Sequence, residues 1–471
     1  MPSPVPEPGL VIFNHELCDE LGLADTCLNS PEAAAILAGN RVPEGAEPLA
    51  MAYAGHQFGH FVPQLGDGRA LLLGKILGPD GTRVDMHLKG SGRTFYSRDG
   101  DGRAALGPVL REYLVSEAMA KLGVPTTRAL AAVTTGEEVA RQQLLPGGVI
   151  TRMARSFVRV GTFEYFSSRS NVDAVTRLAD YVIEHHYPAC REAPQPCLAL
   201  LETVIDKQAA LIARWMQFGF IHGVMNTDNM SIAGETIDYG PCAFMDHYAH
   251  DRVYSSIDHR GRYAYNNQPS IGLWNLTRFA ETLLPLLADN TEAAVEIAKG
   301  ALEQYADRYG DYWLDGMREK TGLTTGRDSD RELVNELFEI MATNSADFTL
   351  TFYYLSKLEA DSPEQDGEVR ALFQEPEQFD RWAQQWRARL REDAIDDATR
   401  QARMQAVNPV YIPRNHQIEA AIRAAEDHGD FSVFHKLHAV LQNPYKLQPQ
   451  KDTYMLPPEP DEVVQQTFCG T

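Results

Sequence analysis

The densest group of polar side chains in this sequence lies between Gly219 and Pro241, in the segment GFIHGVMNTDNMSIAGETIDYGP. His222 is followed seven residues later by Asn229, and Asp238 comes nine residues after that, at the start of an Asp-Tyr-Gly triplet. An Asn amide and an Asp carboxylate in this order are typical of the Mg²⁺ ligands that hold nucleotide phosphates in phosphoryl-transfer enzymes. The segment therefore predicts a metal–nucleotide site with Asn229 and Asp238 as metal ligands.

The proton acceptor of such a site is absent from its usual place. Protein kinases carry an aspartate two residues after the histidine, whereas this chain has Val224 there, and its side chain cannot accept a proton. Asp228, next to Asn229 on the same loop, is the carboxylate that can replace it. The alternative is a purely structural role, because asparagine and aspartate, here Asn226, Asp228 and Asn229, also stabilise turns.

Three Gly-x-Gly-Arg motifs precede this segment, at 66–69, 90–93 and 100–103. Glycine lets backbone N–H groups approach an anion closely, and the following arginine adds a forked donor that suits phosphate oxygens. A single motif of this kind is more often a simple turn. Three copies so close together, in an acidic protein, predict that at least two of them contact phosphate.

These residues need a sheet and a helix to position them. Apolar runs on either side of a Gly-Pro-Asp-Gly turn predict a β-hairpin over 71–88, with Lys89 at its end, and the next segment predicts a helix over 108–122. In kinase-like folds a strand lysine contacts the phosphates and is held by a glutamate of the following helix. Lys89 and Glu112 occupy these places, with Glu117 as the competing carboxylate.

The remaining sequence predicts more sheet and then mostly helix. Residues 127–153 alternate as antiparallel strands do, and Arg152 and Arg159 follow at their end, where a lone arginine is usually a surface residue. Beyond about Val172, helical spacing predicts helices around 201–215, 273–287, 292–309, 331–341 and 377–391. The fold class expected is α+β, a protein-kinase-like bilobal fold: a β-rich lobe over 1–160 with one important helix, a helical lobe over 161–440, and an irregular tail over 441–471.

Composition limits the partners. The 471 residues include 43 Lys and Arg against 65 Asp and Glu, a net charge of −22, which repels nucleic acid and anionic membranes. No apolar run approaches the roughly 18 residues needed to cross a bilayer, and the first residues lack the pattern of a signal peptide. A cytoplasmic protein is expected. The six cysteines form no C-x-x-C pair, so neither a zinc site nor a disulfide framework is indicated.

Four longer strings identify a family. LAMAYAGHQFGHFVPQLGDGRA, HLKGSGRTFYSRDGDGRAAL, FIHGVMNTDNMSIAGETIDYGPCAFMD and NPVYIPRN closely resemble the selenoprotein O family, and the resemblance runs over essentially the whole chain. It implies a protein adenylyltransferase on a pseudokinase fold. ATP would lie in the cleft in a reversed orientation, so that AMP is transferred to Ser, Thr or Tyr hydroxyls of protein substrates and pyrophosphate is released.

The resemblance also assigns roles to individual residues. Asp228 would be the catalytic base, Asn229 and Asp238 would bind Mg²⁺ or Mn²⁺, and Lys89 with Glu112 would organise the phosphates. The nucleotide would be contacted by Gly66, Gly68, Arg69, Asp101, Gly102, Arg152, Arg159 and, through the metal, Asp238.

Two alternative functions use the same residues. One is a kinase, for proteins or small molecules, with a displaced base; it differs only in which phosphorus is attacked. The other is a non-catalytic ATP-binding scaffold, which Val224 favours. In family members with selenocysteine, that residue stands third from the C-terminus, and Cys469 holds the same place here, which suggests a redox role as a hypothesis. Its oxidation to a disulfide with another cysteine is a hypothesis that the sequence does not resolve.

Overall fold

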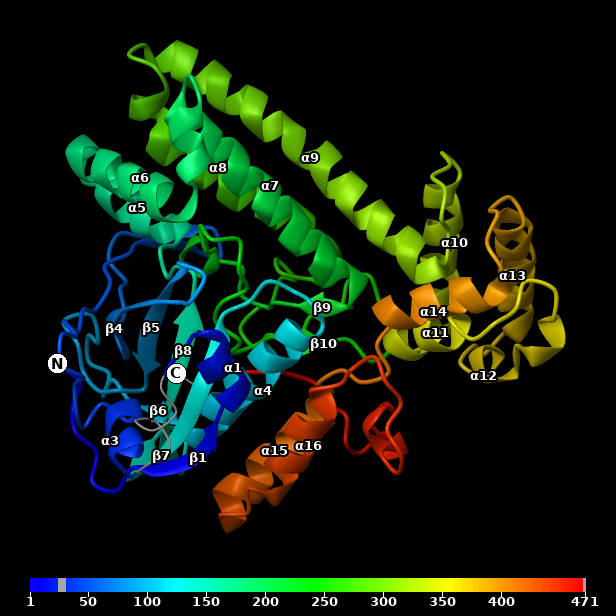
Figure 1. The fold of residues 1–471 in the computed structure, drawn as a ribbon, viewed down its shortest axis with the longest axis horizontal. Coiled ribbons are helices and arrows are strands. Elements are labelled where there is room, and N and C mark those ends of the chain that lie inside the picture. Colours follow the sequence, from blue (N-terminus) through cyan, green and yellow to red (C-terminus); the bar gives the residue numbers. More distant parts are fainter. Residues whose placement is uncertain (24–30, 469–471) are drawn as a thin grey trace.

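A computed structural model describes residues 1–23 and 31–468 of the chain. It combines antiparallel sheet with many helices (Figure 1). The strands are β1 (Gly9–Phe13), β2 (Gly55–Gln57), β3 (His60–Val62), β4 (Ala70–Leu77), β5 (Arg83–Lys89), β6 (Ala104–Ala105), β7 (Arg128–Ala140), β8 (Leu144–Ala154), β9 (Phe220–Ile221) and β10 (Ala243–Phe244). Within the described residues, the main sheet has six strands in the order β1-β7-β8-β5-β4, with β6 pairing β8.

Helices make up most of the rest. They are α1 (His15–Glu20), α3 (Pro31–Leu37), α4 (Leu106–Lys121), α5 (Val160–Ser167), α6 (Val172–His186), α7 (Pro196–Gln217), α8 (Gln268–Leu287), α9 (Thr291–Thr321), α10 (Asp330–Asn344), α11 (Phe348–Leu355), α12 (Gly367–Arg370), α13 (Pro376–Leu390), α14 (Asp397–Val407), α15 (Asn415–His428) and α16 (Ser432–Leu441). The described part of the chain contains no helix both long and apolar enough to pass through a bilayer.

The predicted hairpin is confirmed as β4 and β5, which pair from Ala70 opposite Lys89 to Leu77 opposite Arg83. On its other side β5 pairs with β8, and this register sets His87 opposite Arg152. Opposite residues in adjacent strands point to the same face, and so do residues two apart in one strand. His87, Lys89 and Arg152 therefore share one face of the sheet.

That face is covered by helix α4. The helix begins at Leu106, two residues before the predicted start, because Pro108 fits anywhere in a first turn whose N–H groups have no partner within the helix. Nearly all its side chains are buried, since β7 and β8 lie on one side and α15 and α16 on the other. A helix enclosed in this way holds its polar residues in fixed positions.

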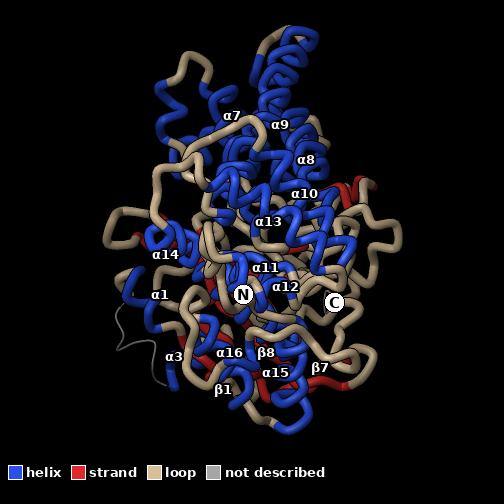
Figure 2. Tube along the Cα trace, turned by 90° about the vertical axis from the view of Figure 1, so that its right-hand side faces the viewer, coloured by secondary structure: helices blue, strands red, loops and turns tan. Residues whose placement is uncertain are grey.

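The helices after the sheet form a separate layer. In Figures 1 and 2 the long helices α7, α8 and α9 lie side by side and extend away from the strands. The helices predicted here are confirmed, although α9 continues to Thr321, twelve residues beyond the predicted end. Helix α5 was not predicted, because its eight residues are too few to display clear helical periodicity.

Later segments contact earlier parts of the region that follows the main sheet. Arg414, in the string NPVYIPRN, is fully buried and bonds Asp246 at 2.6 Å and Asp347 at 2.9 Å. From Gln442 to Phe468 the chain is irregular apart from one 3₁₀ turn over Asp452–Tyr454. Near its end Thr467 pairs with the backbone around Ser255. The chain thus returns to the loop that follows the Asp-Tyr-Gly triplet.

Four of the six cysteines lie within the described residues. Cys18, Cys190 and Cys242 are buried and Cys197 is half-buried. Cys27 and Cys469 lie outside the described residues, and so does the hypothesis about Cys469.

Candidate active site

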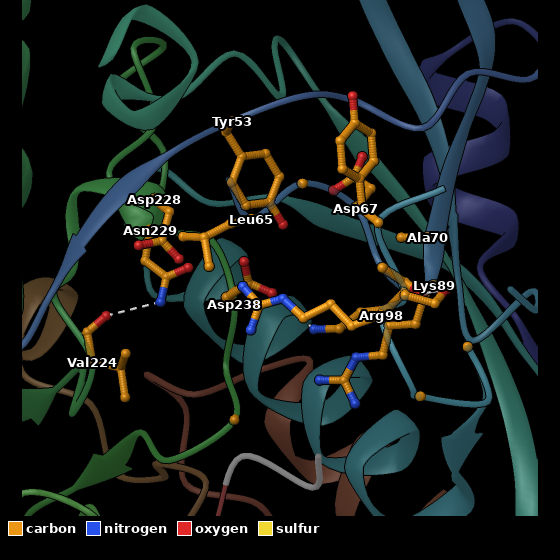
Figure 3. Close-up of a pocket in the computed structure, with 18 of the residues that line it drawn as sticks. Tyr53, Leu65, Asp67, Ala70, Lys89, Arg98, Val224, Asp228, Asn229 and Asp238 are labelled. Carbon is orange, nitrogen blue, oxygen red and sulfur yellow. Dashed lines mark hydrogen bonds and ion pairs between the residues drawn. The ribbon is translucent and has the colours of Figure 1, made fainter. Parts of the chain in front are cut away.

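A cavity of about 830 Å³ opens between the sheet, the glycine-rich loops and the segment 224–241. Figure 3 shows Lys89 and Arg98 on one side of it, Val224, Asp228 and Asn229 on the other, and Asp238 between them. This volume lies within the range of pockets that enclose cofactor-sized ligands. The structure therefore brings together residues that are far apart in the sequence.

An ion pair between Lys89 and Glu112 joins strand β5 to helix α4. Lys89 Nζ lies 2.6 Å from Glu112 Oε2 and 2.8 Å from Asp238 Oδ1. Glu117, the competing carboxylate, instead pairs with Arg128 at 2.9 Å. Burial acts to raise the pKa of Glu112, but Lys89 and Arg152 outweigh it and hold the pKa below its ordinary value. Glu112 is thus a buried carboxylate that fixes the lysine.

Arg152 is fully buried beside this pair, contrary to what a lone arginine in a sequence suggests. Its Nη1 lies 3.1 Å from Glu112 Oε1 and 3.2 Å from Asp238 Oδ1. Its Nη2 lies 3.0 Å from His87 Nδ1, and His87 Nε2 lies 3.1 Å from Asp67 Oδ2. Burial lowers the pKa of His87. The neutral ring accepts a hydrogen bond from Arg152 at Nδ1 and donates one to Asp67 at Nε2. His87 therefore links these two side chains and fixes Arg152 relative to Asp67.

Arg159 is the third cation of the cluster and is buried at the start of helix α5. Its Nη1 donates to the backbone oxygen of Asp228 at 2.7 Å and lies 3.0 Å from Asp238 Oδ2. Its guanidinium lies 4.6 Å from the centre of the Tyr53 ring. These contacts connect the loop that carries Asp228 to the aspartate of the Asp-Tyr-Gly triplet.

Asp238 is therefore surrounded by three cations, Lys89, Arg152 and Arg159. Burial alone would raise its pKa, but Lys89, Arg159 and Arg152 hold the pKa well below the usual range, so the side chain is a carboxylate at neutral pH. Its backbone has a φ of 61°, in the left-handed region. That region is strained for most residues but is tolerated by aspartate. It turns the carboxylate into the cluster.

The loop before Asp238 is fixed by backbone contacts of His222. Its Nε2 donates to the oxygen of Ile237 at 2.8 Å, and its Nδ1 accepts from Val224 N at 3.4 Å. Asn229 Nδ2 in turn donates to Val224 O at 3.0 Å, the bond drawn in Figure 3. The amide nitrogen of Asn229 is used by this bond, so the amide oxygen is the atom that can bind a cation.

Asp228 differs from Asp238 in its electrostatics. Its side chain lines the cavity, but the residue is only 6% exposed. Burial raises the pKa of Asp228 to about 7, against the opposing effect of Arg159. Oδ2 accepts from Gln57 Nε2 at 3.3 Å, and the buried Oδ1 has no hydrogen-bond partner among the described residues. A carboxylate with this pKa is well suited to accept a proton near neutral pH.

The donor set fits a divalent cation bound together with phosphates. Asn229 and Asp238 both line the cavity and offer one amide oxygen and one ionised carboxylate. Mg²⁺ in nucleotide sites takes one or two such oxygens and completes its shell with phosphates and water. The ion pairs of Asp238 with its three cations would have to loosen for this, which a triphosphate favours because it offers the same cations new partners.

Two of the three Gly-x-Gly-Arg motifs line the cavity, at 66–69 and 100–103, whereas the motif at 90–93 does not. Gly66, Gly68, Arg69, Asp101 and Gly102 thus all face it. Asp101 is bonded to Arg141 at 2.8 Å. The motif at 90–93 is instead packed against the start of the chain, where a Cβ at position 92 would overlap the side chain of Ser3.

Sequence reasoning missed several residues of the cavity wall, including Tyr53, Gln57, Asp67 and Arg141. Asp67 lies inside the first Gly-x-Gly-Arg motif, and Tyr53 and Gln57 lie in the first of the four family strings. The motif and the family string are the sequence signals that could have pointed to these residues. Neither indicates which side chain points inward, because that depends on contacts with the segment 224–238.

Comparison with known proteins identifies the family of this chain. The model of the family described as protein adenylyltransferase SelO matches residues 2–442. A protein nucleotidyltransferase YdiU of Rhodopseudomonas palustris (strain BisB18) is 60% identical over 470 residues, which cover 100% of this chain and 95% of the relative. The relative of that name from Rhizobium etli is 56% identical, with 100% and 94% covered. The chain therefore belongs to the SelO family of protein adenylyltransferases.

Proposed function

We propose that this chain transfers AMP from ATP to Ser, Thr or Tyr hydroxyls of protein substrates and releases pyrophosphate. The observation that carries the proposal is the contrast between two cavity aspartates. Asp238 is held ionised by three cations, whereas burial raises the pKa of Asp228 to about 7. One carboxylate is suited to binding a cation and the other to accepting a proton.

The cations Lys89, Arg152 and Arg159 bind the triphosphate. A pyrophosphate leaving group carries more negative charge than the oxygens that an ordinary kinase must stabilise, and three cations that all contact Asp238 match that requirement. Glu112 keeps Lys89 in place, and the Gly-rich loops at 66–69 and 100–103 add backbone N–H groups along the phosphates. Mg²⁺ or Mn²⁺, held by Asn229 and Asp238, supplies further charge neutralisation when bound.

Asp228 is the base. The target hydroxyl oxygen forms a bond to the α-phosphorus, the bond from that phosphorus to pyrophosphate breaks, and the hydroxyl proton passes to the Asp228 carboxylate. Val224 at the usual position of the base is buried and has no proton-accepting side chain. Attack at the α-phosphorus rather than the γ-phosphorus requires ATP to lie in the reversed orientation that the family resemblance implies.

The architecture that we propose for this reaction is a kinase-like bilobal fold. Its lobes comprise residues 1–160 and 161–440, followed by the tail 441–471. The pairing of a strand lysine, Lys89, with a glutamate of the next helix, Glu112, supports it. The Asn229 and Asp238 pair in the following helical part supports it as well.

The decisive experiment uses ATP labelled at either the α- or the γ-phosphate. The full chain is incubated with Mg²⁺ or Mn²⁺ and a bacterial protein extract, and label in protein is followed by gel and by intact-protein mass spectrometry. The α label is expected to enter protein as an adenylyl group. Transfer of the γ label instead would identify a kinase and overturn the proposal.

Matched variants separate catalysis from binding. Asp228→Ala should abolish transfer and retain ATP binding, measured by calorimetry, because the base does not hold the nucleotide. Lys89→Ala should weaken both, because it removes a phosphate ligand. If the wild-type chain binds ATP and transfers neither label, the non-catalytic scaffold is the correct description.

A further inference from the structure

The string AYAGHQFGHF contains the short strand β2, and this strand and the residue after it, Phe58, contact the loop that carries Asp228. Phe58 N donates to Asn226 Oδ1 at 3.0 Å. His56 N donates to Thr227 Oγ1 at 2.7 Å. Two segments that are far apart in the sequence are thus joined through side-chain oxygens of the loop.

The third contact reaches the carboxylate itself. Gln57 Nε2 donates to Asp228 Oδ2 at 3.3 Å, and Gln57 also lines the cavity. Gly55 lies against the other oxygen: a Cβ at position 55 would overlap Asp228 Oδ1. A hydrogen bond on one oxygen and close packing against the other leave the carboxylate one orientation.

The buried Glu164 holds Thr227 and His56 in place through its two carboxylate oxygens. Glu164 Oε2 accepts from Thr227 Oγ1 at 2.5 Å, and Glu164 Oε1 lies 2.5 Å from His56 Nδ1. Ala54 N donates to Gly161 O at 2.9 Å, which fixes the start of the strand to helix α5. The hydroxyl of Thr227 therefore joins strand, helix and loop.

We propose that Gly55–Gln57 is a positioning segment for catalysis, in which Gln57 orients the carboxylate of Asp228 and Thr227 with Glu164 holds the segment in register. Gln57 acts through Asp228 and is not itself a catalytic residue. The inference rests on the proposed function, because it assumes that Asp228 is the base. It assigns a role to a string that the nucleotide and metal sites leave unexplained.

Kinetic variants test the orientation. Gln57→Met keeps the length of the side chain and removes the donor, so the rate of α-label transfer at saturating ATP should fall roughly 10- to 100-fold, the effect of one hydrogen bond to a charged group. The KM for ATP should stay within about twofold, because no nucleotide ligand changes. Gln64→Met, at an exposed position seven residues away, is the matched control and should match the wild type.

A second pair of variants tests the anchor. Thr227→Val removes the hydroxyl at nearly constant shape, whereas Thr227→Ser keeps it. We expect Thr227→Val to lower the transfer rate at unchanged KM and Thr227→Ser to restore most of it. Hydrogen–deuterium exchange provides a readout that does not depend on activity: peptides covering 54–62 and 222–231 should take up deuterium faster in Thr227→Val only.

Three results would overturn the inference: an unchanged rate for Gln57→Met, a KM for ATP that rises as the rate falls, or equal deuterium uptake in Thr227→Val and Thr227→Ser. Failure of the proposed function has a different signature. In that case the wild-type chain transfers no α label, while the exchange experiment still decides whether the segment holds the loop.

Discussion

Asp228→Asn should make the free protein more stable at neutral and alkaline pH while it removes activity. Burial raises the pKa of this carboxyl from 3.8 to about 7. The folded protein therefore retains a proton that the unfolded chain has already released above about pH 4. Between about pH 4 and pH 7 the wild type should lose about 1.4 kcal/mol of stability for each pH unit, relative to the uncharged variant.

The total effect follows from the width of that interval. About three pH units correspond to about 4 kcal/mol above pH 7, where the wild-type carboxylate is ionised in both states. If the chain unfolds in one step, this shifts the melting temperature by about 4 °C, because a chain of this length has a large unfolding entropy. The asparagine has the same shape and can still accept the hydrogen bond from Gln57.

The assay is thermal and urea unfolding of wild type and Asp228→Asn at several pH values from 5 to 8, with chelator and without nucleotide. Asp289→Asn, at an exposed position, is the matched control and should give no such pH dependence. The same Asp228→Asn protein should transfer AMP roughly 100- to 10,000-fold more slowly. A stability difference that stays constant from pH 5 to pH 8 would refute the argument that burial controls this carboxyl.

Further outcomes follow from other contacts. Asp238→Ala should abolish Mg²⁺-dependent ATP binding, measured by calorimetry with and without the metal; equal affinity would contradict its assignment as a metal ligand. Gly102→Ala should weaken ATP binding and lower the melting temperature, because its φ is 71° and a Cβ there overlaps the backbone of Gly92; wild-type behaviour would exclude a tight turn. Arg414→Leu should cost about 3–5 kcal/mol in urea unfolding, because it leaves two buried carboxylates without their partner, and a loss below 1 kcal/mol would argue against that clamp.

The sequence predicted those parts of the fold that depend on interactions between residues close together in the chain. The hairpin of β4 and β5 follows from alternation and a Gly-Pro-Asp-Gly turn, both contained within twenty residues. The predicted end of α9 was wrong: Gly310 follows Tyr309, and glycine is typical of a helix end, but the helix continues and buries Leu314 and Met317. These last turns are helical through contacts with α7 and α14, which a single sequence does not reveal.

The site residues were likewise predictable only where a local signal marks them. The order of Lys89 and Glu112 along the chain was enough to predict their proximity, since a strand followed by a covering helix leaves few arrangements. Nothing local distinguished Arg152 from a surface arginine. Its burial comes from the pairing of β5 with β8, which sets it opposite His87, and that register depends on the whole sheet.

The raised pKa of Asp228, the base that we propose, follows from its burial and from the contacts that the neighbouring cations make elsewhere. Arg159 could have neutralised Asp228, yet its Nη1 donates to the backbone oxygen of that residue and to the carboxylate of Asp238. All three cations of the cluster thus act on Asp238, whose pKa is held well below the usual range. Asp228, ten residues before it, has an amide hydrogen bond on one oxygen, and its other, buried oxygen has no hydrogen-bond partner among the described residues. The same cluster that makes one aspartate a permanent anion therefore leaves the other able to take up a proton near pH 7, and that division of charge is what a base next to a metal–phosphate site requires.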